Sequence, residues 1–324
     1  MISVVIPIYN ADQYLNRCLQ SIKNQTYSDF EVIMVNDGSS DNSKEICVNY
    51  ADNDSRFIYL EQINMGPDIA RKTGVQKATG EYLMYVDADD YIKSSMLQIL
   101  IEKSEEYNAD IVCSNVTRFD DRGKEWNSDD WVTEIIECND FRDIFKEYFV
   151  TRRIIGCYYA KLYKTELFKE YGFIKDSLIG EDISGVIYAL QKAQKIILIP
   201  ESFYFYYWNL SSISHTKYNM RHKISLDNYI RLKKEVIGMD IIEEKYVCGY
   251  FAEFEMAVAT AMSRARAYDI DTINVLRSDL KNYWKMIKSN PKTPFYMKMC
   301  IRCFIFSPKL FIFLYRIVYL VTGR

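Results

Sequence analysis

Short runs of β-branched and aromatic residues alternate with amphipathic segments through the first third of the chain. Strands are predicted at Ile2–Ile8, Phe30–Asn36, Arg56–Glu61 and Glu81–Asp87, with helices near 11–24, 41–52, 67–78 and 94–107. This alternation predicts an α/β fold with a mostly parallel sheet and helices on both faces. Ligands of such sheets bind beyond the carboxyl ends of the strands, so the residues that end each strand are the first candidates for a site.

The pattern is looser after a further predicted strand at Asp110–Val116. We expect a turn at Asp120–Gly123, strands at Trp131–Glu137, Lys195–Ile199 and Phe203–Trp208, and helices near 139–150 and from Asp182. From about residue 220 the chain is predicted to be helical, near 220–238, 241–268 and 271–289. The expected domains are therefore 1–217, with halves at about 1–117 and 118–217, a helical region at 218–290 and a tail at 291–324.

The first two predicted strands end in polar and turn-forming residues. Pro7 closes the first strand ahead of Tyr9 and Asn10, and Asp37 follows the second. Asp37 could accept hydrogen bonds from a nucleobase or ribose, and an aromatic ring nearby could offer a stacking face. Asn, Asp, Gly and Ser are also the residues that favour an ordinary turn and helix cap. The local sequence leaves both interpretations open.

Three carboxylates lie at the end of the fourth predicted strand, at Asp87, Asp89 and Asp90. Such a cluster repels itself unless a cation neutralises it. Because Mg²⁺ or Mn²⁺ on oxygen ligands usually bridges to substrate phosphates, a diphosphate ligand is expected here. The alternative is a solvated turn in which Asp89 or Asp90 only starts the next helix, and the position after the fourth strand favours the metal site.

Two further segments carry charged residues that could act on a ligand. Arg71 lies one turn into a helix that follows Asn64 and Gly66, where its fixed charge could contact phosphate or base. A solvated helix face explains Arg71 equally well. Glu181 and Asp182 precede an apolar run, and one of them could act as a general base towards a sugar hydroxyl. Acidic residues that complement a helix dipole are the alternative.

Taken in order, these segments resemble family-2 glycosyltransferases with the GT-A fold, of the type that builds bacterial surface polysaccharides. The resemblance runs over about the first 215 residues and rests on S-V-V-I-P-I-Y-N, V-N-D-G-S-S-D, N-M-G-P-D-I-A-R-K-T-G, Y-V-D-A-D-D, A-K-L-Y-K-T-E-L-F, G-E-D-I and N-L-S-S-I-S-H. No motif is specific alone, and the order of all seven carries the resemblance. Lys72 and Ser184-Gly185 depart from the commoner family residues, which bears on substrate detail rather than on class.

The resemblance implies roles for the matching residues. Those that would bind the nucleotide sugar, a UDP sugar by resemblance alone, are Pro7, Tyr9, Asn10, Asp37, Asn64, Gly66, Arg71, Asp87 and Ala88. Asp87 and Asp89, with His215, would hold Mn²⁺ or Mg²⁺, although an ordinary loop position explains His215 as well. Asp182, assisted by Glu181, would deprotonate the acceptor hydroxyl, and the sugar would be transferred with inversion.

Composition agrees with a folded protein that stays in the cytoplasm. A chain of 324 residues with 49% hydrophobic residues can bury a large core. The N-terminal segment has the pattern of a strand rather than of a signal peptide. The eight cysteines are scattered within apolar patterns, which suits reduced packing residues better than a disulfide framework.

The tail differs from the rest of the chain in charge. Nine Lys or Arg and no Asp or Glu follow Asp279, although the formal net charge of the whole chain is −3. Apolar stretches in 294–322 are interrupted by Lys298, Arg302, Pro308, Lys309 and Arg316. Basic residues near its centre disfavour a spanning helix, whereas an amphipathic helix pair lying on an anionic membrane fits both features. A tail folded back on the catalytic core is the alternative.

We therefore expect a metal-dependent glycosyltransferase, peripheral at the inner face of the cytoplasmic membrane. It would move a sugar from a nucleoside-diphosphate sugar to a saccharide or lipid-linked saccharide, and no nucleic-acid partner is expected. Three alternatives remain: an inactive nucleotide-sugar-binding protein, a scaffold protein, and a transferase that acts directly on a polyprenyl phosphate. Aspartate-nucleophile phosphatases also use D-x-D, but at the end of the first strand, whereas here the motif follows the fourth.

Overall fold

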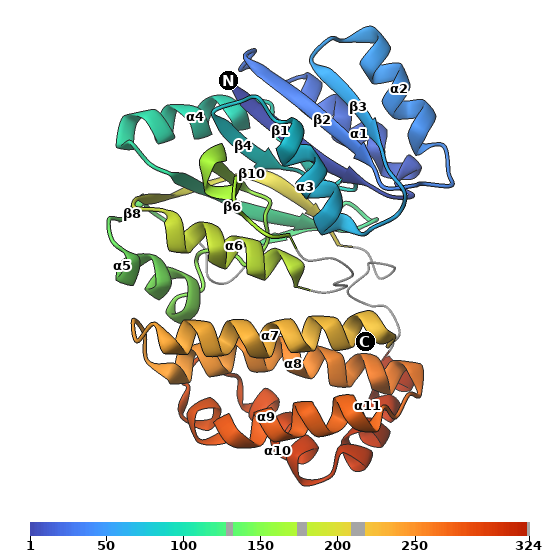
Figure 1. Ribbon diagram of the computed structural model, residues 1–324, viewed down its shortest axis with the longest axis vertical. Coiled ribbons are helices and arrows are strands. Elements are labelled where there is room, and N and C mark those ends of the chain that lie inside the picture. The colour runs from blue at the N-terminus through green and yellow to red at the C-terminus, as the bar shows by residue number, and fades with distance from the viewer. Residues whose placement is uncertain (128–131, 174–179, 209–217, 323–324) are drawn as a thin grey trace. The chain divides into compact units, whose positions relative to one another are not determined.

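The computed structural model describes residues 1–127, 132–173, 180–208 and 218–322 (Figure 1). The chain divides into two compact units. The first comprises Met1–Asp176 and Glu181–Asn209, and the second comprises Ser177–Gly180 and Leu210–Arg324. Each unit has its own core, and each is described by itself.

Ten strands of the described residues form one sheet in the first unit. They are β1 (Ile2–Ile8), β2 (Phe30–Asn36), β3 (Phe57–Glu61), β4 (Tyr82–Tyr85), β5 (Tyr91–Ile92), β6 (Ile111–Phe119), β7 (Glu125–Asn127), β8 (Ile136–Cys138), β9 (Lys161–Lys164) and β10 (Ile196–Tyr207). The order is β3-β2-β1-β4-β9-β6-β10-β5, with β7 beside β6 and β8 beside β10. The ladders among β1, β2, β3 and β4 are parallel, as is the β6–β10 ladder. Because β9 is antiparallel to both β4 and β6, the two groups run in the same direction and end at the same edge.

Helices cover both faces of this sheet, as the alternating pattern predicts. They are α1 (Asp12–Lys23), α2 (Ser43–Asn53), α3 (Pro67–Lys77), α4 (Met96–Tyr107), α5 (Phe141–Phe145) and α6 (Glu181–Lys192), with a π-helical turn at Lys146–Val150 and a 3₁₀ turn at Thr165–Phe168. Alternate residues of β1, from Ile2 to Ile8, lie in the core beneath α1 and α4 because successive strand side chains point to opposite faces. Val5 points the other way, towards α3, where Gly74 is required because a Cβ there would lie 2.3 Å from a Val5 methyl carbon.

The expectation of a mostly parallel sheet is corrected by β9. This strand lies between β4 and β6 and is antiparallel to both, so the sheet is mixed. The sequence pattern conceals it because Lys161 is fully buried within it. The Lys161 ammonium donates to the carbonyl oxygens of Cys157 and Tyr159 at 2.7 and 3.3 Å, which compensates part of its burial.

Three other predictions need correction. The strands expected at 195–199 and 203–208 are one strand, β10, whose register shifts after Leu198, next to Pro200. Proline has no N–H for the ladder, which is why the pattern breaks there without ending the strand. The strand expected at 131–137 is only Ile136–Cys138, and Trp131 lies outside the described residues. The helix expected near 139–150 is the short α5 followed by the π-helical turn.

The second unit is helical throughout its described part. Its helices are α7 (Met220–Gly238), α8 (Glu244–Ala265), α9 (Ile270–Ser289), α10 (Phe295–Phe306) and α11 (Pro308–Thr322). Ile301, Phe304 and Phe311 are buried in the core that α7, α8 and α9 form, so the tail folds as a helix pair on its own helical unit. None of the described helices is long and apolar enough to cross a bilayer.

Candidate active site

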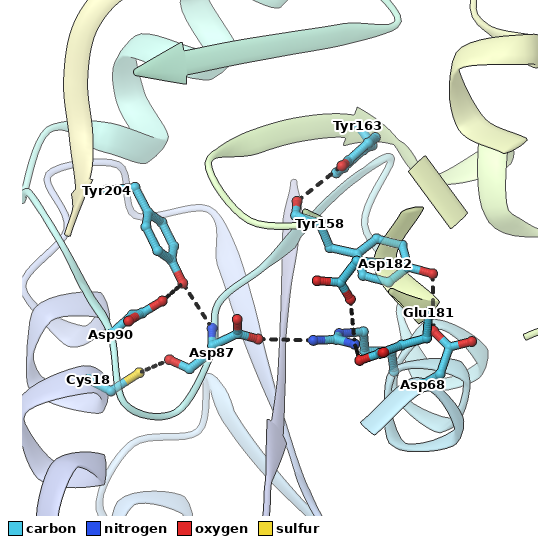
Figure 2. A network of polar contacts seen from close by, with 10 residues as sticks. Cys18, Asp68, Asp87, Asp90, Tyr158, Tyr163, Glu181, Asp182 and Tyr204 are labelled. Carbon is cyan, nitrogen blue, oxygen red and sulfur yellow. Dashed lines mark hydrogen bonds and ion pairs between the residues drawn. The ribbon is translucent and has the colours of Figure 1, made fainter. Parts of the chain in front are cut away.

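Three charged segments that are distant in the sequence meet at a single arginine. The Arg71 guanidinium lies 3.1 Å from Asp87 Oδ1 through Nη2, 2.9 Å from Asp182 Oδ1 through Nη1, and 3.5 Å from Glu181 Oε1 (Figure 2). Asp87 follows β4, Arg71 lies in α3, and the two acids begin α6. The parallel strands and the start of α6 therefore bring these candidates together at the carboxyl edge of the sheet.

Arg71 is buried. The alternative that the sequence left open, a solvated helix face, is therefore wrong. Only 4% of its surface is exposed, and its guanidinium carbon lies 4.9 Å from the centre of the Tyr158 ring. Tyr158 in turn donates a hydrogen bond of 3.1 Å to buried Asp68. The arginine is thus fixed in one place, with carboxylates on one side and an aromatic face beside it.

The two acids at the start of α6 have different proton affinities. Burial raises the pKa of Asp182 to about 6, although the Arg71 guanidinium opposes that rise. Burial, and to a smaller extent repulsion from Asp182, raises the pKa of Glu181 to about 8. The Arg71 guanidinium lies nearer to Asp182 than to Glu181, at 2.9 against 3.5 Å, and so favours the ionised form of Asp182 more, which makes Asp182 the better placed of the two to accept a proton.

We expect any reaction that uses Asp182 as a base to slow below about pH 6. The proton that Asp182 takes up as pH falls through its pKa of about 6 removes the lone pair that accepts the substrate proton. The value of kcat/KM should consequently rise with pH up to about 6 and then level off. A profile that is flat from about pH 5 to 8 would contradict this assignment.

The Asp87–Asp90 segment contains one fully buried and two half-buried carboxyl groups. Asp90 is 0% exposed, so a freely solvated turn does not describe it. Burial, followed by the charge of Asp87, raises the pKa of Asp89 to about 6. A cation would relieve both effects, and carboxylate oxygens are the ligands that Mg²⁺ and Mn²⁺ prefer, so Asp87 and Asp89 fit such an ion.

Such an ion would need ligands in addition to Asp87 and Asp89. Within the described parts of the chain, no three His, Cys, Asp or Glu side chains are grouped to hold a metal. His215 lies outside the described residues, so its role as a ligand stays a prediction. Oxygen atoms of a bound diphosphate are the usual completion of a site that has one or two carboxylates.

Comparison with known proteins shows the family to which the chain belongs. The family model described as Glycosyl transferase family 2 matches residues 3–172. The chain belongs to glycosyltransferase family 2. Among its relatives, the uncharacterized glycosyltransferase EpsJ of Bacillus subtilis is 32% identical over 71% of this chain and 67% of its own length. Glycosyltransferase GlyG of Streptococcus pneumoniae is 33% identical over 68% of this chain and 75% of its own length.

Other relatives extend beyond the matched region. Glycosyltransferase GlyA of Streptococcus pneumoniae is 34% identical over 66% of this chain, which spans only 31% of GlyA.

Among solved structures, S. aureus TarS 1-349 in complex with UDP-GlcNAc has a TM-score of 0.69 at 20% identity, over 100% of this chain and 92% of that chain. This likeness shows the fold, a GT-A-like α/β sheet followed by a helical C-terminal region.

In this family-2 chain, Asp37 holds together the segment at which the nucleotide is expected to bind. One of its carboxylate oxygens accepts from Gln62 Nε2 at 2.7 Å and Met65 N at 2.9 Å, and the other accepts from Gly66 N at 2.8 Å. Gly66 has φ +91°, a conformation that glycine adopts without strain. Asp37 therefore shapes the segment before α3, and its direct contact with a nucleobase stays a prediction.

The remaining predicted ligands lie around the same edge. Asn10 has a left-handed backbone, and its side-chain oxygen accepts from Ser40 N at 2.8 Å, which ties the end of β1 to the turn after β2. Tyr9 and Asn64 are exposed there, Pro7 is half-buried and Ala88 is buried. The structure places these residues at the edge, and their contacts with a ligand stay a prediction.

Three residues of the site, Tyr158, Asp68 and Tyr204, carry no functional signal of their own in the sequence. Tyr158 and Asp68 flank Arg71, and Tyr204 hydrogen-bonds the Asp87–Asp90 segment. Each is an ordinary residue of an apolar pattern or a helix N-terminus in the sequence. The signal that could have led to Tyr204 is its partner Asp90, the third aspartate of D-A-D-D.

Proposed function

We propose that the chain transfers a sugar from a UDP sugar to a hydroxyl group of a saccharide or lipid-linked saccharide, with inversion at the anomeric carbon. The observation that carries this proposal is the placement of Asp182 and Asp87 on one buried arginine. This placement supports a role for Asp182 as a base beside the predicted diphosphate site. The presence of UDP-GlcNAc in the TarS complex supports a UDP sugar as the donor.

The residues divide the chemistry between them. Asp182 accepts the proton of the acceptor hydroxyl while that oxygen forms a bond to the anomeric carbon and the bond from that carbon to the diphosphate breaks. Arg71 contacts Asp182 at 2.9 Å, which orients the base and favours its ionised form. Asp87 and Asp89 would hold Mn²⁺ or Mg²⁺, whose charge would stabilise the departing nucleoside diphosphate.

The test is release of nucleoside diphosphate by purified protein from a panel of nucleotide sugars, with Mn²⁺ or Mg²⁺ and with or without EDTA. We expect release from one donor, lost with EDTA and in Asp89→Ala but retained in Asp52→Ala, a matched change at an exposed aspartate of α2. Failure of folded, metal-loaded protein to bind any nucleotide sugar would refute the proposal. Binding without release, in the presence of acceptor extracts, would indicate an inactive binding protein.

The C-terminal helix pair supports an acceptor at a membrane surface. The inner face of α10 and α11 is buried in the helical core. Large apolar side chains remain exposed on the pair, namely Phe295, Tyr296, Met299, Phe306, Leu310, Phe313, Leu314, Ile317 and Val318. A patch of this kind, within a segment whose charged residues are all basic, suits the surface of a bilayer that contains anionic lipids.

We expect the protein to bind vesicles that contain phosphatidylglycerol more tightly than vesicles of phosphatidylcholine alone. The double change Phe306→Ser and Phe313→Ser should weaken binding by about tenfold or more, because it removes apolar area that enters the bilayer. Ile63→Ser is the control in the first unit, since Ile63 and Phe306 are both 79% exposed. Cosedimentation with vesicles measures the effect. Equal binding by wild type and the double variant, or dimerisation without vesicle binding, would contradict it.

A further inference from the structure

A chain of hydrogen bonds connects the end of β10 to the segment that carries the two predicted metal ligands. The Asp87 backbone N–H donates to the Tyr204 hydroxyl oxygen at 3.1 Å, and the Tyr204 hydroxyl donates to Asp90 Oδ2 at 2.6 Å. The Tyr207 backbone N–H donates to Asp90 Oδ1 at 2.7 Å. Figure 2 shows the Tyr204 hydroxyl between Asp90 and the backbone of Asp87.

Tyr204 and Asp90 have little freedom to move. Both are 0% exposed, and the Tyr204 ring is stacked on Tyr159 with centroids 4.6 Å apart and an angle of 11°. Both carboxylate oxygens of Asp90 accept hydrogen bonds from β10. A buried carboxylate with its oxygens used in this way does not face a ligand, so its contribution is to the geometry of the neighbouring residues.

Further contacts hold the same segment from α1. Arg17 Nη2 donates to the carbonyl oxygen of Asp89 at 2.6 Å, and Cys18 Sγ lies 3.5 Å from the carbonyl oxygen of Asp87. The Asp90 N–H closes the turn onto that same Asp87 oxygen at 3.1 Å. The backbone at Asp87 and Asp89 is therefore fixed from two elements, β10 and α1.

We propose that Asp90 and Tyr204 are positioning residues that set the separation of the Asp87 and Asp89 carboxylates and thereby the affinity for a divalent cation. The inference rests on the metal–diphosphate site of the proposed function. Mg²⁺ and, with less strictness, Mn²⁺ need oxygen ligands at defined distances, and groups that orient the ligands commonly change metal affinity by about 10- to 100-fold when removed. Neither residue touches the reacting atoms, so neither is catalytic.

Tyr204→Phe tests this directly because it removes both hydrogen bonds of the hydroxyl and keeps the stacked ring. Tyr206→Phe is the matched control, since Tyr206 lies on the same strand and stacks on the same Tyr159 at 5.5 Å. Binding of Mn²⁺ to each full-length protein, with and without UDP, is measured by electron paramagnetic resonance of free Mn²⁺. We expect about tenfold weaker Mn²⁺ binding in Tyr204→Phe and unchanged binding in Tyr206→Phe.

Activity provides a second measurement. If the hydroxyl positions the metal ligands, Tyr204→Phe should need about tenfold more Mn²⁺ for half-maximal activity and recover most of its kcat at saturating Mn²⁺. A loss of activity that is the same at every Mn²⁺ concentration would indicate a merely structural role and overturn the inference. If Tyr204→Phe does not fold, Asp90→Asn, which keeps the side-chain shape, is measured in the same way with the same expected shift.

The possible failures can be told apart. Equal Mn²⁺ affinity in wild type, Tyr204→Phe and Asp90→Asn would overturn the positioning role and leave the proposed function intact. Absence of Mn²⁺ binding by wild type, both with and without UDP, would overturn the metal site itself and the inference with it.

Discussion

Replacement of Asp182 by asparagine is expected to lower kcat by about 10³-fold, within the range of about 10² to 10⁴ that general base catalysis contributes. The amide cannot accept the proton of the acceptor hydroxyl, yet it has nearly the shape of the carboxylate and can occupy the same position 2.9 Å from Arg71. The structure should therefore be retained and the affinity for donor nucleotide should change little. Steady-state kinetics give kcat, and titration with nucleotide gives the affinity.

Glu181→Gln is the matched control for this prediction. Burial and repulsion from Asp182 raise the pKa of Glu181 to about 8, which favours its protonated form, and glutamine reproduces that neutral form. We expect its effect on kcat to be several-fold at most. If Glu181→Gln were as damaging as Asp182→Asn, the difference in role between the two acids that their pKa values predict would be wrong.

Replacement of Arg71 by methionine is expected to destabilise the protein by about 2–3 kcal/mol at pH 8. Removal of one partner of a fully buried ion pair costs about 3–5 kcal/mol. The loss expected here is smaller than that range because the carboxylates of Asp87, Glu181 and Asp182 keep some contact with solvent. Denaturant unfolding, monitored by circular dichroism, measures the change.

The loss of stability in Arg71→Met should depend on pH. Without the guanidinium, the pKa values of the neighbouring carboxyl groups rise further in the folded state, so the folded protein binds protons more readily than the unfolded chain. Protonation then removes the repulsion, and the destabilisation should be smaller at about pH 5 than at pH 8. Lys72→Met removes the same charge from the next residue, which is half-buried, and should change stability little at either pH. A pH-independent loss would show that Arg71 acts through packing and not through charge.

The sequence by itself determined the elements of the first half of the sheet. Strands β1 and β2 have the predicted bounds, and α3 ends within one residue of its prediction. Such accuracy is possible because residues that alternate between two faces, or recur every three to four positions, are set by local geometry. The candidate residues of the site were also visible in the sequence, because Asp87 and Asp89 follow one strand and Asp182 lies in the first turn of one helix.

Only the tertiary structure decided how these groups are arranged. Arg71 forms ion pairs with Glu181 and Asp182 of α6, which lie 110 or more positions further along the sequence. No local pattern encodes such a contact. The different pKa values of Glu181 and Asp182 arise because burial and neighbouring charges act through space. Strand β9 escaped prediction for a related reason. A lysine reads as a surface residue in sequence, whereas Lys161 is buried where folded carbonyl groups accept its hydrogen bonds. Local periodicity thus defines elements, and the environment that sets charge and burial exists only once distant elements have packed together.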